Sequence, residues 1–268
     1  MRPFAPAALA LLLAAPALAQ APDDAPIQDN SFLIEEAYNQ DPGVVQHISI
    51  YQRSRDGGAW VATFTQEWPA PSLKHQLSYT LAALGDDANG NGFGDVALNY
   101  RYQLLGDADA QVAIAPRFSL LLPTGDAEKG RGAGGTGLQV NLPVSIAVSP
   151  SLAAHSNAGF TYTRNADGGP GIEADTRAWN LGQSFVWLAR PRFNALLEVV
   201  YTNAEVPKGP GTTSHEESLT VSPGIRWAYN FPSGLQIVPG LALPIGVGPS
   251  DGERAVFLYL SFEHPFRR

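Results

Sequence analysis

The chain has 268 residues, no cysteine and a formal net charge of −8. This negative charge argues against a nucleic-acid partner, because a phosphate backbone attracts a basic surface. The lack of cysteine excludes thiolate metal sites and cysteine nucleophiles, and an exported chain of this composition must be held together by packing and closed hydrogen bonding instead of disulfides.

Residues 1–19 predict a secretory signal peptide. Arg2 supplies the positive charge, residues 7–15 form an unbroken apolar run, and Ala17-Leu18-Ala19 matches an A-x-A cleavage site. A membrane-spanning helix, the alternative reading, needs about 20 apolar residues, which is longer than this run. No later apolar stretch approaches that length, so a chain that enters a membrane must cross it as strands.

Residues 20–43 are rich in Pro, Asp and Gln and show no regular alternation. Within them we expect a short helix from Phe32 to Tyr38, with Ser31 as its N-cap and Glu35 and Glu36 in the first turns. The sequence leaves open whether this N-terminal segment plugs the protein that follows.

From Val44 onward the hydrophobic pattern has a period of two, which predicts β-strands. About twelve strands are expected, and most are longer than the five or six residues usual in soluble sheets. The predicted strands are Val44–Ser54, Ala59–Trp68, Leu73–Leu84, Asp95–Leu104, Gln111–Leu122, Thr136–Val148, Leu152–Thr163, Thr176–Leu188, Arg192–Thr202, Glu216–Tyr229, Leu235–Ile245 and Arg254–Phe262.

Each strand has one apolar and one polar face. In the sixth, Leu138 and Val140 alternate with Gln139 and Asn141, and side chains two apart share a face. One face therefore requires hydrocarbon and the other water. A secreted β-sandwich is the alternative, since its strands also alternate, but its apolar faces would meet inside.

The connections favour the membrane barrel, because short and long ones interleave along the chain. The tight turns are Pro69–Ser72, Leu105–Ala110, Ser149–Ser151, Ala189–Pro191 and Asn230–Gly234; the long loops are Gly85–Gly94, Pro123–Gly135, Arg164–Asp175, Asn203–His215 and Gly246–Glu253. Aromatic residues gather near strand ends, as they do at lipid headgroups. We therefore predict an all-β fold over residues 44–268: a closed, antiparallel, up-and-down transmembrane β-barrel in the bacterial outer membrane.

Several short motifs carry a family resemblance. They are Phe32-Leu33-Ile34-Glu35-Glu36-Ala37-Tyr38-Asn39-Gln40, Gly92-Phe93-Gly94-Asp95 and Leu122-Pro123-Thr124-Gly125-Asp126. With them the chain resembles the bacterial outer-membrane family labelled meta-pathway of phenol degradation, whose members are often called transporters. The resemblance implies a barrel that passes small hydrophobic or aromatic compounds. Phe262, His264 and Phe266 also resemble the C-terminal barrel-assembly signal, although Arg267 and Arg268 follow.

The polar faces of the strands identify candidate lumen residues, and among them arginines outnumber acidic residues. The candidates are Lys74, Arg101, Arg117, His155, Asn157, Glu198, Arg226 and Glu263.

The first hypothesis for the function is a passive channel for small solutes, with selectivity from these residues and the Pro123–Gly135 loop. The second is a non-conducting anchor or interaction barrel. The expected partners are outer-membrane lipid, a small-molecule solute and the barrel-assembly machinery, reached through the C-terminal strand. No cofactor, catalytic residue or metal ligand is expected.

The third hypothesis is a lipid hydrolase, which His155-Ser156-Asn157 suggests. Outer-membrane phospholipases and deacylases are also barrels, but their His and Ser stand two apart and so share a face. Here the two are adjacent and point to opposite faces, so we predict that the chain is not an enzyme.

Two loops also resemble ligand sites in composition. Asp86, Asp87, Asn89 and Asn91 lack the spacing of a calcium-binding loop, and the glycines around Arg131 lack the Gly-Lys-Ser/Thr ending of a phosphate-binding loop.

Overall fold

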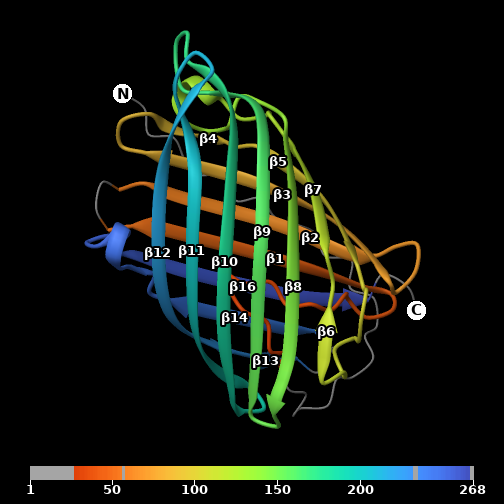
Figure 1. Ribbon diagram of the computed structural model, residues 1–268. Helices are drawn as coiled ribbons and strands as arrows, with labels where there is room; N and C mark the ends of the chain where they lie inside the picture. Colours follow the sequence, from red (N-terminus) through yellow and green to blue (C-terminus); the bar gives the residue numbers. More distant parts are fainter. Residues whose placement is uncertain (1–26, 56–57, 232–234, 266–268) are drawn as a thin grey trace, which may run out of the picture.

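The chain forms a closed barrel of long antiparallel strands (Figure 1), described here from a computed structural model. The structure describes residues 27–55, 58–231 and 235–265. The predicted signal peptide lies outside the described residues, and so does Phe266 of the predicted assembly signal. Among the residues that are described, no helix is long and apolar enough to cross a membrane.

Within the described residues, sixteen strands make up the sheet. Their bounds are β1 Val44–Ser54, β2 Trp60–Pro69, β3 His75–Asp86, β4 Gly90–Phe93, β5 Val96–Tyr102, β6 Val112–Ile114, β7 Arg117–Leu122, β8 Gly137–Ser149, β9 Leu152–Asp167, β10 Glu173–Arg190, β11 Phe193–Gly209, β12 Thr212–Trp227, β13 Tyr229–Asn230, β14 Gln236–Ala242, β15 Ile245–Gly246 and β16 Ala255–Pro265. Two short 3₁₀-helices, η1 Ala127–Lys129 and η2 Gly248–Ser250, lie in the connections.

These strands form a barrel wall with twelve positions. Three wall positions are each formed by two consecutive strands, namely β6 with β7, β12 with β13, and β14 with β15. The short strand β4 pairs with β3 alone and does not occupy a wall position. β1 pairs with β16 from Val44↔Pro265 to Ser54↔Ala255, which joins the first strand to the last. Closure matters because an unpaired strand edge exposed to hydrocarbon is very costly. The prediction of a closed barrel of about twelve strands is confirmed.

The barrel is apolar outside and polar inside, the reverse of a soluble protein. On β8, Leu138 is 58 % exposed and Leu142 43 %, whereas Asn141 and Ser145 on the opposite face are buried. On β5, Leu98 is exposed while Asn99 and Arg101 are buried. This inverted pattern excludes the sandwich alternative, because a sandwich would bury the apolar faces against each other.

The connections depart from the prediction at one end of the barrel. Two of the predicted long loops, Arg164–Asp175 and Asn203–His215, are largely strand in the structure: β9 and β10 pair out to Asp167 and Glu173, and β11 and β12 to Gly209 and Thr212. The backbone of polar residues makes the same ladder hydrogen bonds as the backbone of apolar residues. Pairing therefore continues beyond the apolar band. We call this the long-loop end, and the opposite end, where Ser149–Leu152 and Arg190–Phe193 turn, the tight-turn end.

Candidate functional site

Residues 27–43, which we call the inserted segment, enter the barrel interior from the tight-turn end and return to it. At one end the amide of Ile27 donates to the carbonyl of Pro191, in the turn between β10 and β11. At the other end Gly43 leads directly into β1. Most residues between them are buried, including Phe32, Ile34, Ala37 and Tyr38. The segment therefore forms a re-entrant loop inside the lumen.

No helix forms over Phe32–Tyr38, so the expected short helix is wrong. A helix of seven residues is marginal by itself, since helices shorter than about 12 residues rarely hold in water. Here the backbone amides have better acceptors in the barrel wall. The amides of Phe32, Leu33 and Ile34 donate to one oxygen, Oε1 of Glu198 on β11, at 3.1, 2.8 and 3.1 Å. Glu198 is fully buried.

The next residue of the inserted segment, Glu35, is bound by three wall residues. Its carboxylate receives two hydrogen bonds from Arg117 on β7, at 2.9 Å from Nε and 2.5 Å from Nη2, and one from Asn141 at 3.0 Å. Its backbone exchanges two hydrogen bonds with the Asn157 amide, at 2.8 and 3.0 Å. Paired, charge-assisted bonds of this kind are among the strong ones in proteins.

The returning half of the segment follows a ladder of wall side chains toward the tight-turn end. Ala37 donates to Ser145 at 2.7 Å, Asn39 to Gln103 at 3.0 Å and Gln40 to Gln76 at 2.8 Å. Arg101 donates to the Glu36 carbonyl at 3.1 Å and to Asn39 at 3.2 Å. These bonds replace the water that the backbone amides and carbonyls would otherwise bind, so the segment is held along its whole length.

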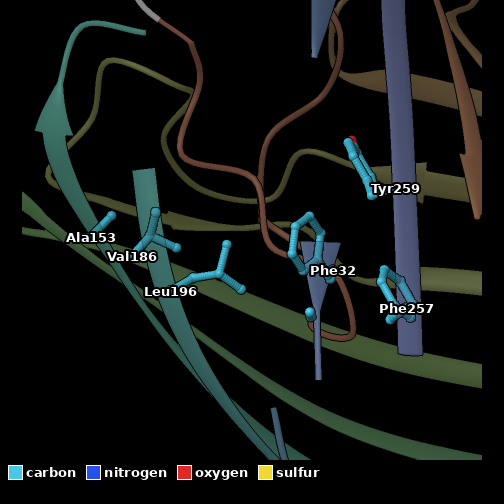
Figure 2. Packing of buried hydrophobic residues seen from close by; sticks show 7 residues of the cluster. Phe32, Ala153, Val186, Leu196, Phe257 and Tyr259 are labelled. Carbon is cyan, nitrogen blue, oxygen red and sulfur yellow. The ribbon is translucent and has the colours of Figure 1, made fainter. Parts of the chain in front are cut away.

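Phe32 anchors the apex of the segment in an apolar cluster (Figure 2). Its ring lies 5.3 Å from that of Phe257 and 5.1 Å from that of Tyr259, both on β16. Two strand glycines make room for it: a Cβ at Gly240 would lie 2.5 Å from the ring and one at Gly224 2.8 Å. Glycine inside a strand commonly marks such a close approach.

Two cavities lie in the barrel lumen, and a third lies at the tight-turn end. The outer cavity, about 540 Å³, lies toward the long-loop end beside Ser54 and Glu253. The inner cavity, about 300 Å³, lies between the inserted segment and the middle of β1, β2 and β3. The lower cavity, about 320 Å³, lies at the tight-turn end beside Asp41 and Lys74. Leu33 lines both the outer and the inner cavity and so separates them.

Most of the candidate lumen residues lie in the barrel interior. Arg101, His155, Asn157, Glu198 and Arg226 are buried, and Arg117 is largely so. Each contacts the inserted segment; Arg226 donates to the carbonyl of Asn30, and His155 Nε2 lies 3.0 Å from the carbonyl of Asp29. The alternation of the strands does not indicate these contacts.

Lys74 differs from its prediction, because it is exposed in the turn between β2 and β3 instead of lying on a strand face. The expected excess of arginine in the lumen is also wrong. The inserted segment and Glu67 add carboxylates, so that the interior acids outnumber the interior arginines. The acids are Asp29, Glu35, Glu36, Glu67, Glu198 and Glu263, and the arginines Arg101, Arg117 and Arg226.

His155 and Ser156 point in opposite directions. Ser156 donates to Gln183 at 2.6 Å, whereas His155 Nδ1 lies 2.8 Å from a different hydroxyl, that of Ser145. Ser145 and His155 are both buried, and the amide of Ala37 already donates to the Ser145 oxygen. A nucleophile needs access to substrate as well as a base within hydrogen-bond reach, and neither residue lines a cavity described above.

The acidic residues after β3 accept hydrogen bonds from their own loop and from the loop after β7. Asp86 accepts hydrogen bonds from Ala88 and Asn89, and Asp95 accepts them from Gly125 and Ala133. In the neighbouring loop a hydrogen bond from Lys129 lowers the pKa of Asp126 below its ordinary value. Asp126 also lies 3.7 Å from Arg131, which donates to the carbonyl of Asn91 and so ties the two loops together.

Comparison with known proteins supports the fold. No protein-family model matches the chain, and no curated protein matches it in sequence. Solved structures do match: an outer membrane channel from Pseudomonas putida F1 is 14 % identical, with 85 % of this chain and 97 % of that one covered and a TM-score of 0.61. The KdgM porin is 10 % identical, with 81 % and 98 % covered and a TM-score of 0.50. At such identities the likeness shows the fold alone.

The closed barrel with an apolar exterior is therefore a bacterial outer-membrane β-barrel. The two matched structures share this barrel fold. The more specific resemblance to the phenol-degradation family stays a prediction.

Proposed function

We propose that the chain is a passive outer-membrane channel for small solutes and that the inserted segment is its gate. The observation that carries this proposal is the position of Leu33, which lies between the outer and the inner cavity of the lumen. By the usual orientation of such barrels, the tight turns face the periplasm and the long loops the exterior. A solute then enters through the outer cavity, and displacement of the inserted segment lets it continue.

The size of the barrel supports a narrow path. Barrels of about eight strands are filled by their own side chains, whereas sixteen to eighteen strands enclose a wide aqueous pore. Twelve positions lie between these limits, which leaves room for one short segment and small cavities. The inner cavity has an apolar wall that includes Ile48, Ile50 and Phe32. This wall, like the predicted family membership, favours solutes with a small hydrophobic or aromatic body.

A non-conducting anchor is the second candidate function, and the hydrogen bonding of the inserted segment favours it. Three amides on Glu198 and a paired salt bridge from Arg117 to Glu35 make a closed lumen the stable state. The two candidate functions differ in whether this segment ever leaves. They also differ in which part of the barrel acts: an anchor acts through its external loops and does not require an open lumen.

Conductance decides between them. The full chain and a variant lacking residues 27–43 are reconstituted in planar bilayers and in liposomes. The channel account predicts brief openings of the full chain and a lasting open state of the variant, with swelling of liposomes in small sugars or amino acids. A full chain that stays silent, beside a variant that conducts, favours the anchor. Silence of a correctly folded variant rejects the channel.

A further inference from the structure

The inner cavity contains a buried carboxylate that the rest of the barrel leaves unmatched. Glu36 is 8 % exposed and lines this cavity. Within the described part of the chain, no donor lies within hydrogen-bonding distance of its carboxylate, and the only bond to this residue is the one that its backbone carbonyl accepts from Arg101. A buried ionised carboxylate without a partner is costly, because burial removes its hydration.

The arginines near this cavity bond to other groups, although Nη2 of Arg101 and Nε of Arg226 are buried without a hydrogen-bond acceptor among the described residues. Arg117 is bonded to Glu35 at 2.5 Å, and Arg101 faces the carboxylate of Glu67 at 3.7 Å. Arg226 donates to the backbone of the inserted segment and lies over the ring of Tyr259. Glu36 itself repels the carboxylates of Asp29, Glu67 and Glu263. The missing partner of Glu36 is therefore a positive charge.

The wall of this cavity combines apolar side chains with hydroxyl, amide and carboxylate groups. Leu33, Ile48 and Ile50 line the inner cavity together with the rings of Phe32 and Tyr259. Such a wall offers a hydrocarbon body an apolar surface as well as polar contacts. It suits an ammonium group that carries a hydrocarbon body, and the aromatic faces add cation–π attraction.

We propose that the inner cavity binds a small organic ammonium compound, with its charged nitrogen on the Glu36 carboxylate and its apolar body against Leu33, Ile48 and Ile50. This inference rests on the proposed function and adds to it a class of solute. The ammonium group would donate the hydrogen bonds that Glu36 lacks, and its charge would offset the excess of acid in the lumen. Ligand release toward the tight-turn end then requires movement of the segment that carries Glu36.

Binding to the full-length, detergent-solubilised barrel tests the proposal by titration calorimetry. The probes are benzylamine, benzyl alcohol and benzoate, which share a ring and differ in charge, and methylamine, which lacks the ring. Benzylamine is expected to bind at least about tenfold more tightly than each of the other three, because one charge-assisted hydrogen bond corresponds to roughly that factor. Equal affinity for the three ring compounds, or no binding of benzylamine, overturns the proposal.

Two variants locate the site. Glu36→Gln is expected to weaken benzylamine binding about tenfold or more, while leaving benzyl alcohol unchanged. Glu128→Gln makes the same chemical change on an exposed loop residue and serves as the matched control. If Glu36→Gln impairs folding, Glu36→Asp keeps the charge and must retain the preference for the amine. Unchanged binding in a folded Glu36→Gln variant places the ligand elsewhere and contradicts the proposal.

These binding results do not depend on transport. Benzylamine binding beside a variant lacking residues 27–43 that is silent in bilayers would support the site and reject the channel. Conductance of that variant without benzylamine binding to the full chain would support the channel and reject the site.

Discussion

The amide of Leu33 donates to the carboxylate of Glu198 at 2.8 Å, although 165 residues separate the two in the chain. This bond lies at the apex of the inserted segment, between the outer and inner cavities. The same oxygen also accepts from Phe32 and Ile34. A single wall carboxylate thus fixes the part of the segment that blocks the lumen.

Glu198→Ala is therefore expected to open the barrel. The change leaves three amides without an acceptor, and each buried amide that loses its partner costs about 1–3 kcal/mol unless water reaches it. Single-channel recording should show the open fraction rise at least about tenfold. Glu217→Ala, on the exposed end of β12, is the control and should conduct like the unmodified chain. An open fraction that does not change would mean that Glu198 does not hold the segment.

The salt bridge of Arg117 with Glu35 should behave as a coupled pair. Arg117→Ala and Glu35→Ala are each expected to speed ion efflux from liposomes, because each removes one partner and leaves the other charge poorly matched. The double variant is expected to be close to either single variant, since the interaction can be lost only once. Additive effects in this double-mutant cycle would show that the two side chains act independently.

The close approach of Phe32 to Gly240 leads to a steric prediction. Gly240→Ala places a methyl group against the ring of Phe32, which should displace the inserted segment and expose it to chymotrypsin at Leu33 and Tyr38. Replacing Phe32 with Ala in the same chain should restore part of the protection, because it removes the ring that clashes. Gly209→Ala, at the long-loop end, is the control. Full protection of the Gly240→Ala variant would contradict the packing described here.

The lipid-facing surface gives a prediction about stability. Leu142 lies on the exposed face of β8, and Leu142→Arg is expected to lower the free energy of unfolding into vesicles by about 2–4 kcal/mol, as arginine does near the bilayer midplane. Glu217→Arg, beyond the apolar band, should change it by much less. A loss under about 0.5 kcal/mol for Leu142→Arg would mean that this face does not contact hydrocarbon.

The barrel itself follows from local patterns in the sequence. Alternation along a strand such as β8 assigns each side chain to lipid or lumen, and the predicted bounds of β8 agree with the structure to within one residue. The extensions of β9 to β12 are not predicted, because beyond the apolar band the residues on both faces are mostly polar. A run of polar residues in the sequence looks the same whether it forms a strand or a loop.

The inserted segment is not predictable in this way. Its contacts with Glu198, Asn157 and Ser145 join residues more than 100 positions apart, and no local period encodes them. Ser31 and Glu35 resembled a helix start, yet in the structure Ser31 bonds Ser184 and Glu35 binds Arg117. One signal was present: glycines inside strands, such as Gly240, mark places where another part of the chain comes close.

The account depends on the inserted segment leaving the lumen when solute passes. The hydroxyl oxygens of Ser31 and Ser184 are 2.6 Å apart, and the chain has no cysteine, so a Ser31→Cys/Ser184→Cys variant offers a reversible lock. Single-channel recording of this variant is made before and after addition of a reductant. The account predicts silence while the disulfide is formed and openings once it is reduced. Equal conductance in both states, or silence in both, would contradict it.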